Sequence, residues 1–323
     1  MTIIKIIRDP SEREPGYGVD SEDEKAAMGG TRFARRTAKK GILPMVQQYL
    51  LASDFDQTLS FNDSGVVLAE LVGVQGFHDK VRGLAQINLV QQGAELSYLI
   101  LHDPEFRRIR REHLVEAGKL IRLKHDVKLF AKTLETLADG YKFNFHVISA
   151  APQEIIQSAL EGIVPPENIH GTKFYYEPGN GEVKAIVRAS AGWGKVTVIE
   201  EIRAQLGTSH DHIVYMGDGS SDLPVMMHVN QYDGLTIAVS EAEFITRIAR
   251  RTVLSDNAMS VLVPVLEEVM RWDSSKIRRY FATQGLMLRE WGKIRTDLLT
   301  IEESPEPIPA ADQAPAQTPL ITH

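Results

Sequence analysis

The segment that most constrains this chain is the one in which an apolar run meets a pair of acids. The run at residues 45–52, interrupted only by Gln47 and Gln48, leads through Ser53 into Asp54-Phe55-Asp56-Gln57-Thr58. This pattern predicts a buried strand that ends in a loop of carboxylates. If Asp54 and Asp56 leave the strand on the same side, their oxygens converge and repel each other unless they share a proton or a cation. Mg²⁺ meets this need, because it prefers oxygen ligands and binds through few carboxylates.

Composition narrows the class of protein. The 323 residues are 43% hydrophobic and 24% charged, which predicts a globular chain of one large or two modest domains. The net charge of -7 argues against a nucleic-acid partner, and the absence of cysteine excludes disulfides, thiolate metal sites and cysteine nucleophiles. No uncharged apolar run approaches the roughly 20 residues that span a bilayer, and the first residues lack a signal-peptide pattern. We therefore expect a cytoplasmic protein with no membrane partner, and the oligomeric state stays open.

Strands and helices alternate along most of the chain. Strands are expected at residues 45–52, 143–149, 213–216 and 235–239, with a β-hairpin at 169–187 and helices between the strands. This alternation predicts an α/β fold with a Rossmann-like parallel sheet flanked by helices, whose ligands bind beyond the carboxyl ends of the strands. The expected divisions are a polar and basic N-terminal extension (1–44), a core (45–62 and 125–270), an inserted helical module (63–124), a helical C-terminal extension (271–301) and a disordered tail (302–323).

Two arginine-rich segments have more than one interpretation. The basic segment at residues 31–40 is interpreted as a solvated extension or helix face, and a patch for an anionic partner is the alternative. Within the inserted module, helices are predicted over residues 81–101 and 104–123. The second would carry Arg107, Arg108, Arg110 and Arg111, which cannot all face one site at helical spacing. A solvated face is preferred, and contact of one arginine with a substrate carboxylate is the alternative.

Polar groups lie at four comparable places, three after strands and one at the start of a helix. They are Asp54 with Asp56, Ser149 at the end of the second strand, Lys195 at the start of a helix, and Asp218 with Asp222 after the third strand. This set contains a carboxylate nucleophile, an acid or base beside it, ligands for a cation and donors for phosphate oxygens. Together these are the groups that phosphoryl transfer requires.

A role for each group follows from that chemistry. Asp54 would attack phosphorus, and Asp56 would protonate the leaving oxygen and then deprotonate the attacking water. Lys195 and the cation would offset the charges of nucleophile and phosphate, and Ser149 would donate to a phosphate oxygen. Lys195 alone would be an ordinary solvated lysine, and Ser149 alone an ordinary helix cap. Their order between the acidic motifs favours the functional interpretation.

These residues resemble the four motifs of the haloacid dehalogenase superfamily of phosphatases, in the same order. The resemblance covers about residues 45–255, and it implies that Asp54 is the nucleophile and Asp56 the acid/base. It also implies that Mg²⁺ is bound by Asp54, the backbone carbonyl of Asp56 and Asp218, with support from Asp222. Thr58, which closes the first motif, is expected to bind phosphate together with Ser149 and Lys195. The inserted helical module resembles the cap of the phosphoserine-phosphatase-like branch, which closes over the site and reads the leaving group.

The chain also departs from that branch. Phosphoserine phosphatases have a glutamate where this chain has Asp63, and glycines where it has Ala150 and Ala151. Asp63 is interpreted either as the cap of the helix that follows it or as a weak contact for a substrate amine. The expected function is a Mg²⁺-dependent phosphatase acting on a small phosphorylated metabolite. The alternatives are a phosphotransferase with the same aspartyl-phosphate and a binding or scaffold protein.

Overall fold

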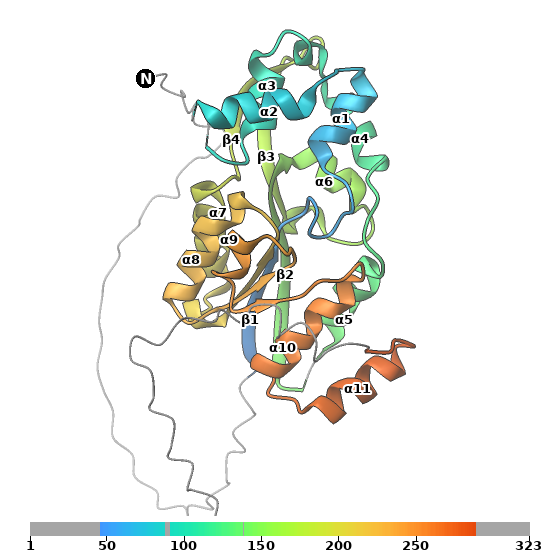
Figure 1. Cartoon of the computed structure of the whole chain (residues 1–323), viewed down its shortest axis with the longest axis vertical. Coiled ribbons are helices and arrows are strands. Elements are labelled where there is room, and N and C mark those ends of the chain that lie inside the picture. The colour runs from blue at the N-terminus through green and yellow to red at the C-terminus, as the bar shows by residue number, and fades with distance from the viewer. Residues whose placement is uncertain (1–45, 88–90, 138, 289–323) are drawn as a thin grey trace, which may run out of the picture.

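A single mixed sheet runs through the computed structural model, which describes residues 46–87, 91–137 and 139–288. The sheet has the strand order β4-β3-β2-β1-β5-β6-β7, and every neighbouring pair is parallel except β3 and β4 (Figure 1). The strands are β1 (Gln47–Ser53), β2 (Tyr141–Pro152), β3 (Ile169–Tyr176), β4 (Val183–Arg188), β5 (Ile213–Gly217), β6 (Leu235–Ala238) and β7 (Arg251–Thr252). The predicted Rossmann-like α/β fold is confirmed. The two-residue strand β7 was too short to be predicted from a pattern.

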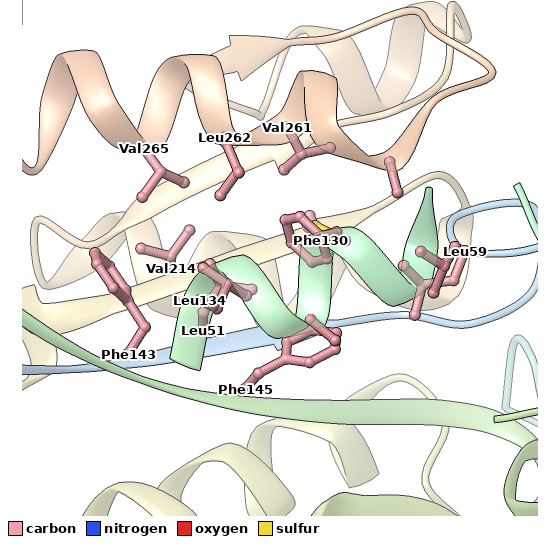
Figure 2. Packing of buried hydrophobic residues seen from close by; sticks show 14 of the residues in the cluster. Leu51, Leu59, Phe130, Leu134, Phe143, Phe145, Val214, Val261, Leu262 and Val265 are labelled. Atoms are coloured by element: carbon pink, nitrogen blue, oxygen red, sulfur yellow. The ribbon is translucent and has the colours of Figure 1, made fainter. Parts of the chain in front are cut away.

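Helices cover both faces of the sheet, because β1 and β5 in its centre are apolar on both sides. On one face lie α5 (Val127–Thr136), α10 (Leu262–Glu268) and α11 (Ser274–Thr283), and on the other α7 (Trp193–Leu206), α8 (Leu223–Gln231) and α9 (Glu243–Thr246). Figure 2 shows Phe130 and Leu134 of α5 packed between the sheet and Leu262 of α10. Burial of each such side chain contributes about 1.5–3 kcal/mol, so this packing fixes the strand ends that carry the acids.

The inserted helices pack on one another and on the adjoining part of the core. They are α1 (Ser64–Val72), α2 (Phe77–Gln86), α3 (Glu95–His102) and α4 (Arg111–Lys119), and they lie between β1 and β2 in the chain. Their buried residues form a separate apolar cluster that also includes Phe174 of β3 and Ile155 of α6 (Gln153–Ala159). This helical module sits at one end of the sheet (Figure 1). The cap assignment for residues 63–124 stays an interpretation, which the separate cluster favours.

The two long helices predicted in this module are both interrupted. In place of a helix over 104–123 the chain forms a 3-10 turn, η1 (Phe106–Arg108), then extended backbone at Ile109 and Arg110 before α4 begins. Ile109 is buried in the module's apolar cluster, and Arg110 forms an isolated β-bridge with Glu182 of the hairpin. These tertiary contacts outweigh helix propensity, so the four arginines do not share one helix.

The remaining short elements are 3-10 turns that connect strands and helices. They are η2 (Pro166–Asn168), η3 (His210–His212), η4 (Ser220–Asp222) and η5 (Ala258–Val261). In the described part of the chain, no helix has the length and apolar character required to cross a bilayer. The N-terminal extension (1–44), the end of the C-terminal extension beyond residue 288 and the tail (302–323) are predictions that lie outside the described residues.

Candidate active site

The predicted site residues meet at the carboxyl end of the sheet. Asp54 follows β1, Asp218 follows β5, and Lys195 is the third residue of α7. The two central strands are parallel neighbours, and the backbone amide of Asp54 donates to the carbonyl of Met216 over 2.9 Å. Parallel neighbours end at the same edge of a sheet, so the acids of two distant motifs are brought together.

Lys195 lies between two buried carboxylates. Its Nζ atom is 3.0 Å from Asp54 Oδ1 and 2.6 Å from Asp222 Oδ1, and its side chain has no exposed surface. Burial and the charge of Asp222 raise the pKa of Asp54 to about 6, although the Lys195 ammonium acts in the opposite direction. The two carboxylates raise the pKa of Lys195 despite its burial. This lysine is therefore a permanent cation beside the predicted nucleophile.

Asp222 is held by four donors. Its Oδ1 accepts from Lys195 Nζ and from the Tyr215 hydroxyl, each over 2.6 Å. Its Oδ2 accepts from the backbone amides of Asp218 and Gly219, over 3.1 and 3.0 Å. With two donors on each oxygen, this carboxylate orients Lys195 and the loop that carries Asp218. This geometry suits the supporting role at the metal that the resemblance implies for Asp222, and that role stays a prediction.

The Asp222 carboxylate also requires a glycine at position 217. A Cβ atom at that position would lie 2.4 Å from Asp222 Cγ, which is too close for any real contact. We expect Gly217→Ala to displace the carboxylate, lower the free energy of unfolding by about 1–3 kcal/mol and reduce catalysis at least tenfold. Thermal unfolding with a turnover assay measures both effects.

Gly219→Ala is the matched control for stability, because a Cβ there would come no closer than 4.0 Å to Asp222 Oδ2 and the backbone is extended. Equal melting temperatures for the two variants would contradict the steric argument.

Asp218 and Thr58 join the first and last motifs. Thr58 is buried, with 3% of the residue exposed, and its hydroxyl donates to Asp218 Oδ1 over 3.1 Å. Burial and the charges of Asp54 and Asp222 raise the pKa of Asp218 to about 7. Thr58 was predicted to bind phosphate, and in this structure its hydroxyl positions Asp218.

Asp56 is held by Ser64, the first residue of helix α1 in the helical module. Ser64 donates from its amide to Asp56 Oδ1 over 2.9 Å and from its hydroxyl to Oδ2. Burial and the nearby charge of Asp63 raise the pKa of Asp56 well above its ordinary value. A raised pKa favours the protonated form of the carboxyl, which suits a general acid. Ser64 therefore links the predicted acid/base to the helical module.

Asp63 caps helix α1. Its Oδ1 accepts from the amides of Gly65 and Val66 over 2.8 and 3.0 Å, so the interpretation as a helix cap is confirmed. The predicted contact with a substrate amine stays a prediction.

Ser149 lies where strand β2 becomes irregular. The register between β2 and β3 shifts between Ile148 and Pro152, and the Ala151 amide donates to Ser149 Oγ over 3.3 Å. The side chain is 1% exposed. Ser149 was predicted to end the strand, but β2 continues to Pro152, so the serine lies at an irregularity near its carboxyl end. Its hydroxyl proton is available for another acceptor.

The acidic group fits a hard divalent cation. Asp54, Asp218 and Asp222 each offer a carboxylate oxygen, and these atoms lie within 4.8 Å of one another. Three carboxylates lie near one ammonium, and burial together with the neighbouring negative charges raises the pKa values of Asp54 and Asp218. Oxygen ligands around an excess of negative charge are what Mg²⁺ selects. Asp54 and Asp218 are the residues best placed to hold it.

A comparison with protein families decides the classification. The sequence matches the family model described as haloacid dehalogenase-like hydrolase over residues 51–227, more than half of the chain. The chain belongs to the haloacid dehalogenase-like hydrolases. The resemblance stated from the motifs is confirmed, and so is the prediction of an enzyme of the hydrolase class. A search of curated protein sequences found no significant match.

Solved structures of this superfamily share the fold. A substrate-bound phosphoserine phosphatase is similar with a TM-score of 0.55 and 18% identity, over 67% of this chain and 98% of that one. A phosphoserine phosphohydrolase-like protein from Francisella tularensis has a TM-score of 0.53 and 16% identity, over 67% and 99%. A HAD family hydrolase from Salmonella enterica serovar Typhi has a TM-score of 0.56 and 14% identity, over 71% and 73%. At such identities the similarity shows the fold alone.

Two residues of this hydrolase's site were missed in the sequence. Tyr215 was counted only as part of a buried apolar strand, yet its hydroxyl holds Asp222. A tyrosine in a fully buried strand is a signal, because its hydroxyl requires a partner there. Ser64, which binds Asp56, follows Asp63 directly and carries no comparable signal.

Proposed function

We propose that this hydrolase is a Mg²⁺-dependent phosphatase that cleaves the phosphomonoester of a small metabolite through an aspartyl-phosphate on Asp54. The observation that carries the proposal is the buried Asp54 carboxylate with Lys195 Nζ at 3.0 Å and the Asp218 carboxylate beside it. An ion pair between Asp54 and Lys195 that served only the fold would not need the Asp218 carboxylate in the same small volume. A carboxylate that attacks a phosphate dianion needs positive charge beside it, which Lys195 and a cation held by Asp218 would supply.

The first half-reaction uses Asp54 as nucleophile. Its ionised carboxylate forms an O–P bond while the bond from phosphorus to the ester oxygen breaks. Lys195 keeps the carboxylate ionised near neutral pH against the effect of burial. The ammonium also attracts the incoming phosphate, with Ser149 as a further donor to its oxygens.

Asp56 moves the proton in both halves of the reaction. With its raised pKa it begins protonated and gives the proton to the leaving alcohol oxygen. The resulting carboxylate then takes a proton from the water that attacks phosphorus and releases Asp54. The two hydrogen bonds from Ser64 stabilise this ionised form, so Asp56 can alternate between the two states.

Mg²⁺, when bound, would neutralise part of the charge on the nucleophile and the phosphate. Asp54 and Asp218 would hold it through their carboxylates, with the Asp56 carbonyl as the third expected ligand. Thr58 fixes the Asp218 carboxylate through one oxygen, and Asp222 fixes the loop through the amide of Asp218. These contacts reduce the reorganisation that binding a cation requires.

The helical module restricts the space for the leaving group. Gln91 Nε2 donates to the carbonyl of Ala191 over 2.9 Å, two residues before α7. A Cβ atom at Gly93 would lie 2.7 Å from Ser221 Cβ and 3.4 Å from Ala150 Cβ, so this loop contacts the segments around three of the motifs. A site covered in this way favours a small substrate over a phosphoprotein.

Mg²⁺ is expected to stabilise the protein more at pH 8 than at pH 5.5. Without the cation, Asp54 and Asp218 hold protons up to about pH 6 and 7, whereas the unfolded carboxyls lose them near 3.8. The folded state then binds more protons, so the contribution of these groups to stability falls as pH rises through that window. Mg²⁺ binds the ionised carboxylates and so restores stability at high pH. At a Mg²⁺ concentration of one hundred times Kd, the free energy of unfolding rises by about 2.7 kcal/mol.

Thermal unfolding with Mg²⁺ and with EDTA at both pH values measures this difference. Asp218→Asn should remove the increment at pH 8, and an equal increment in that variant would place the cation elsewhere.

The test of the function is phosphate release from a panel of small phosphomonoesters, with Mg²⁺ or with EDTA. The proposal predicts release that EDTA abolishes. Added alcohols should not increase turnover, since an increase would identify a phosphotransferase. A folded protein that binds Mg²⁺ and releases no phosphate from any ester would contradict the proposal.

A further inference from the structure

A second cluster of potential metal ligands lies away from the acidic site. It joins Glu200 of α7, His210 of η3 and His228 of α8, and their ligand atoms lie within 4.8 Å of one another. His210 Nε2 is 3.2 Å from Glu200 Oε2, and His228 Nε2 is 2.8 Å from Glu200 Oε1. Both imidazoles therefore direct the same type of ring nitrogen to one carboxylate. The three side chains are partly exposed, at 29%, 34% and 17%, so an ion has access from solvent.

Neighbouring groups hold these side chains in place. The Tyr232 ring stacks on His210 with a centroid distance of 4.4 Å and meets His228 edge-on at 5.2 Å. Arg203 Nε donates to Glu200 Oε2 over 2.8 Å and fixes the carboxylate. Since Oε2 already accepts from Arg203, Oε1 is the oxygen better suited to a cation. Pre-oriented ligands lose little conformational entropy on binding.

The donor set selects a different metal from the acidic site. Two imidazole nitrogens and one carboxylate oxygen are ligands of Zn²⁺, whereas Mg²⁺ prefers oxygen alone. We propose that Glu200, His210 and His228 bind a zinc ion, which replaces the two hydrogen bonds to the carboxylate. Each neutral imidazole then carries its proton on Nδ1 and offers the Nε2 lone pair to the ion.

The position of this site suggests what the zinc does. Glu200 lies five residues after Lys195 on α7, and His228 lies six residues after Asp222, in the helix that follows it. Zinc bound to these side chains joins α7, α8 and η3 and so fixes the two helices next to the acidic site. The zinc is structural, and it stabilises the folded state because the unfolded chain does not hold the three ligands together.

Calorimetric titration of the full chain with Zn²⁺ in excess Mg²⁺ tests the proposal, because Mg²⁺ competes for the acidic site that the proposed function assigns to it. We expect saturable binding of one ion, and at least tenfold weaker binding in His210→Gln and in His228→Gln. Zn²⁺ should also raise the melting temperature of the wild type and not that of these variants. His78→Gln on the exposed surface of α2 should bind Zn²⁺ as the wild type does.

Three outcomes would overturn the proposal. One is the absence of saturable Zn²⁺ binding in excess Mg²⁺, and another is unchanged affinity in both histidine variants. The third is loss of Zn²⁺ binding in Asp218→Asn with retention in the histidine variants, which would assign the zinc to the acidic site. Melting curves without metal show whether each variant is folded, and Co²⁺ absorption spectra report the tetrahedral site independently of stability.

Discussion

Replacing Asp54 by asparagine is expected to lower phosphate release by about 10⁴-fold or more, because the variant has no carboxylate to attack phosphorus. The side chains have nearly the same shape, so the substrate should still bind. The fold should also survive, because a neutral amide replaces a buried carboxylate. Burial already disfavours the ionised form of that carboxylate, as its raised pKa indicates. Lys195 retains Asp222 as its partner at 2.6 Å. Steady-state phosphate release and thermal unfolding of the purified variant measure the two expectations.

Asp79→Asn is the matched control for this variant. Asp79 lies on α2, its side chain is 79% exposed, and its ion pair with Arg82 is at the surface. Loss of its charge should leave turnover and melting temperature unchanged, because exposed pairs contribute little to stability. Turnover in Asp54→Asn within tenfold of the wild type would exclude Asp54 as the nucleophile.

The sequence was sufficient to predict which motifs converge. Asp54 and Asp218 follow apolar runs, and parallel strands that neighbour each other end at one edge of the sheet. These acids meet as long as the two strands that carry them are neighbours in the sheet. Lys195 joins them because it lies at the start of the helix that precedes the second of these strands. The alternation of strands and helices was enough for the fold class as well.

The sequence did not predict how the side chains share hydrogen bonds. The role of Asp222 depends on where the Tyr215 hydroxyl and the amides of the loop point, and no residue spacing reports this. Likewise, Glu200, His210 and His228 meet across a span of 28 residues without a motif, because two helices and a turn pack side by side. Side-chain orientation and tertiary packing are the missing information in both cases.

Replacing Lys195 by methionine is expected to have the largest effect on stability. The variant keeps the length and apolar stem of the side chain but leaves Asp54 and Asp222 buried without their cation. Loss of one partner of a buried ion pair costs about 3–5 kcal/mol. The carboxyls can avoid part of this cost by taking up protons, so the loss should be larger at pH 8 than at pH 5.5. Phosphate release should fall at least about a hundredfold at both pH values, because the ammonium that attracts the phosphate is gone.

Tyr215→Phe separates the charge of Lys195 from the hydrogen bonding around Asp222. It removes one donor to Asp222 Oδ1 and leaves the lysine in place, so the expected loss is about 1–3 kcal/mol. That loss should depend little on pH, because the ammonium still balances the two carboxylates. Urea unfolding of both variants at pH 5.5 and pH 8 makes the comparison. A Lys195→Met variant as stable as Tyr215→Phe at pH 8 would mean that the carboxylates do not need this cation, and the electrostatic account of the site would be wrong.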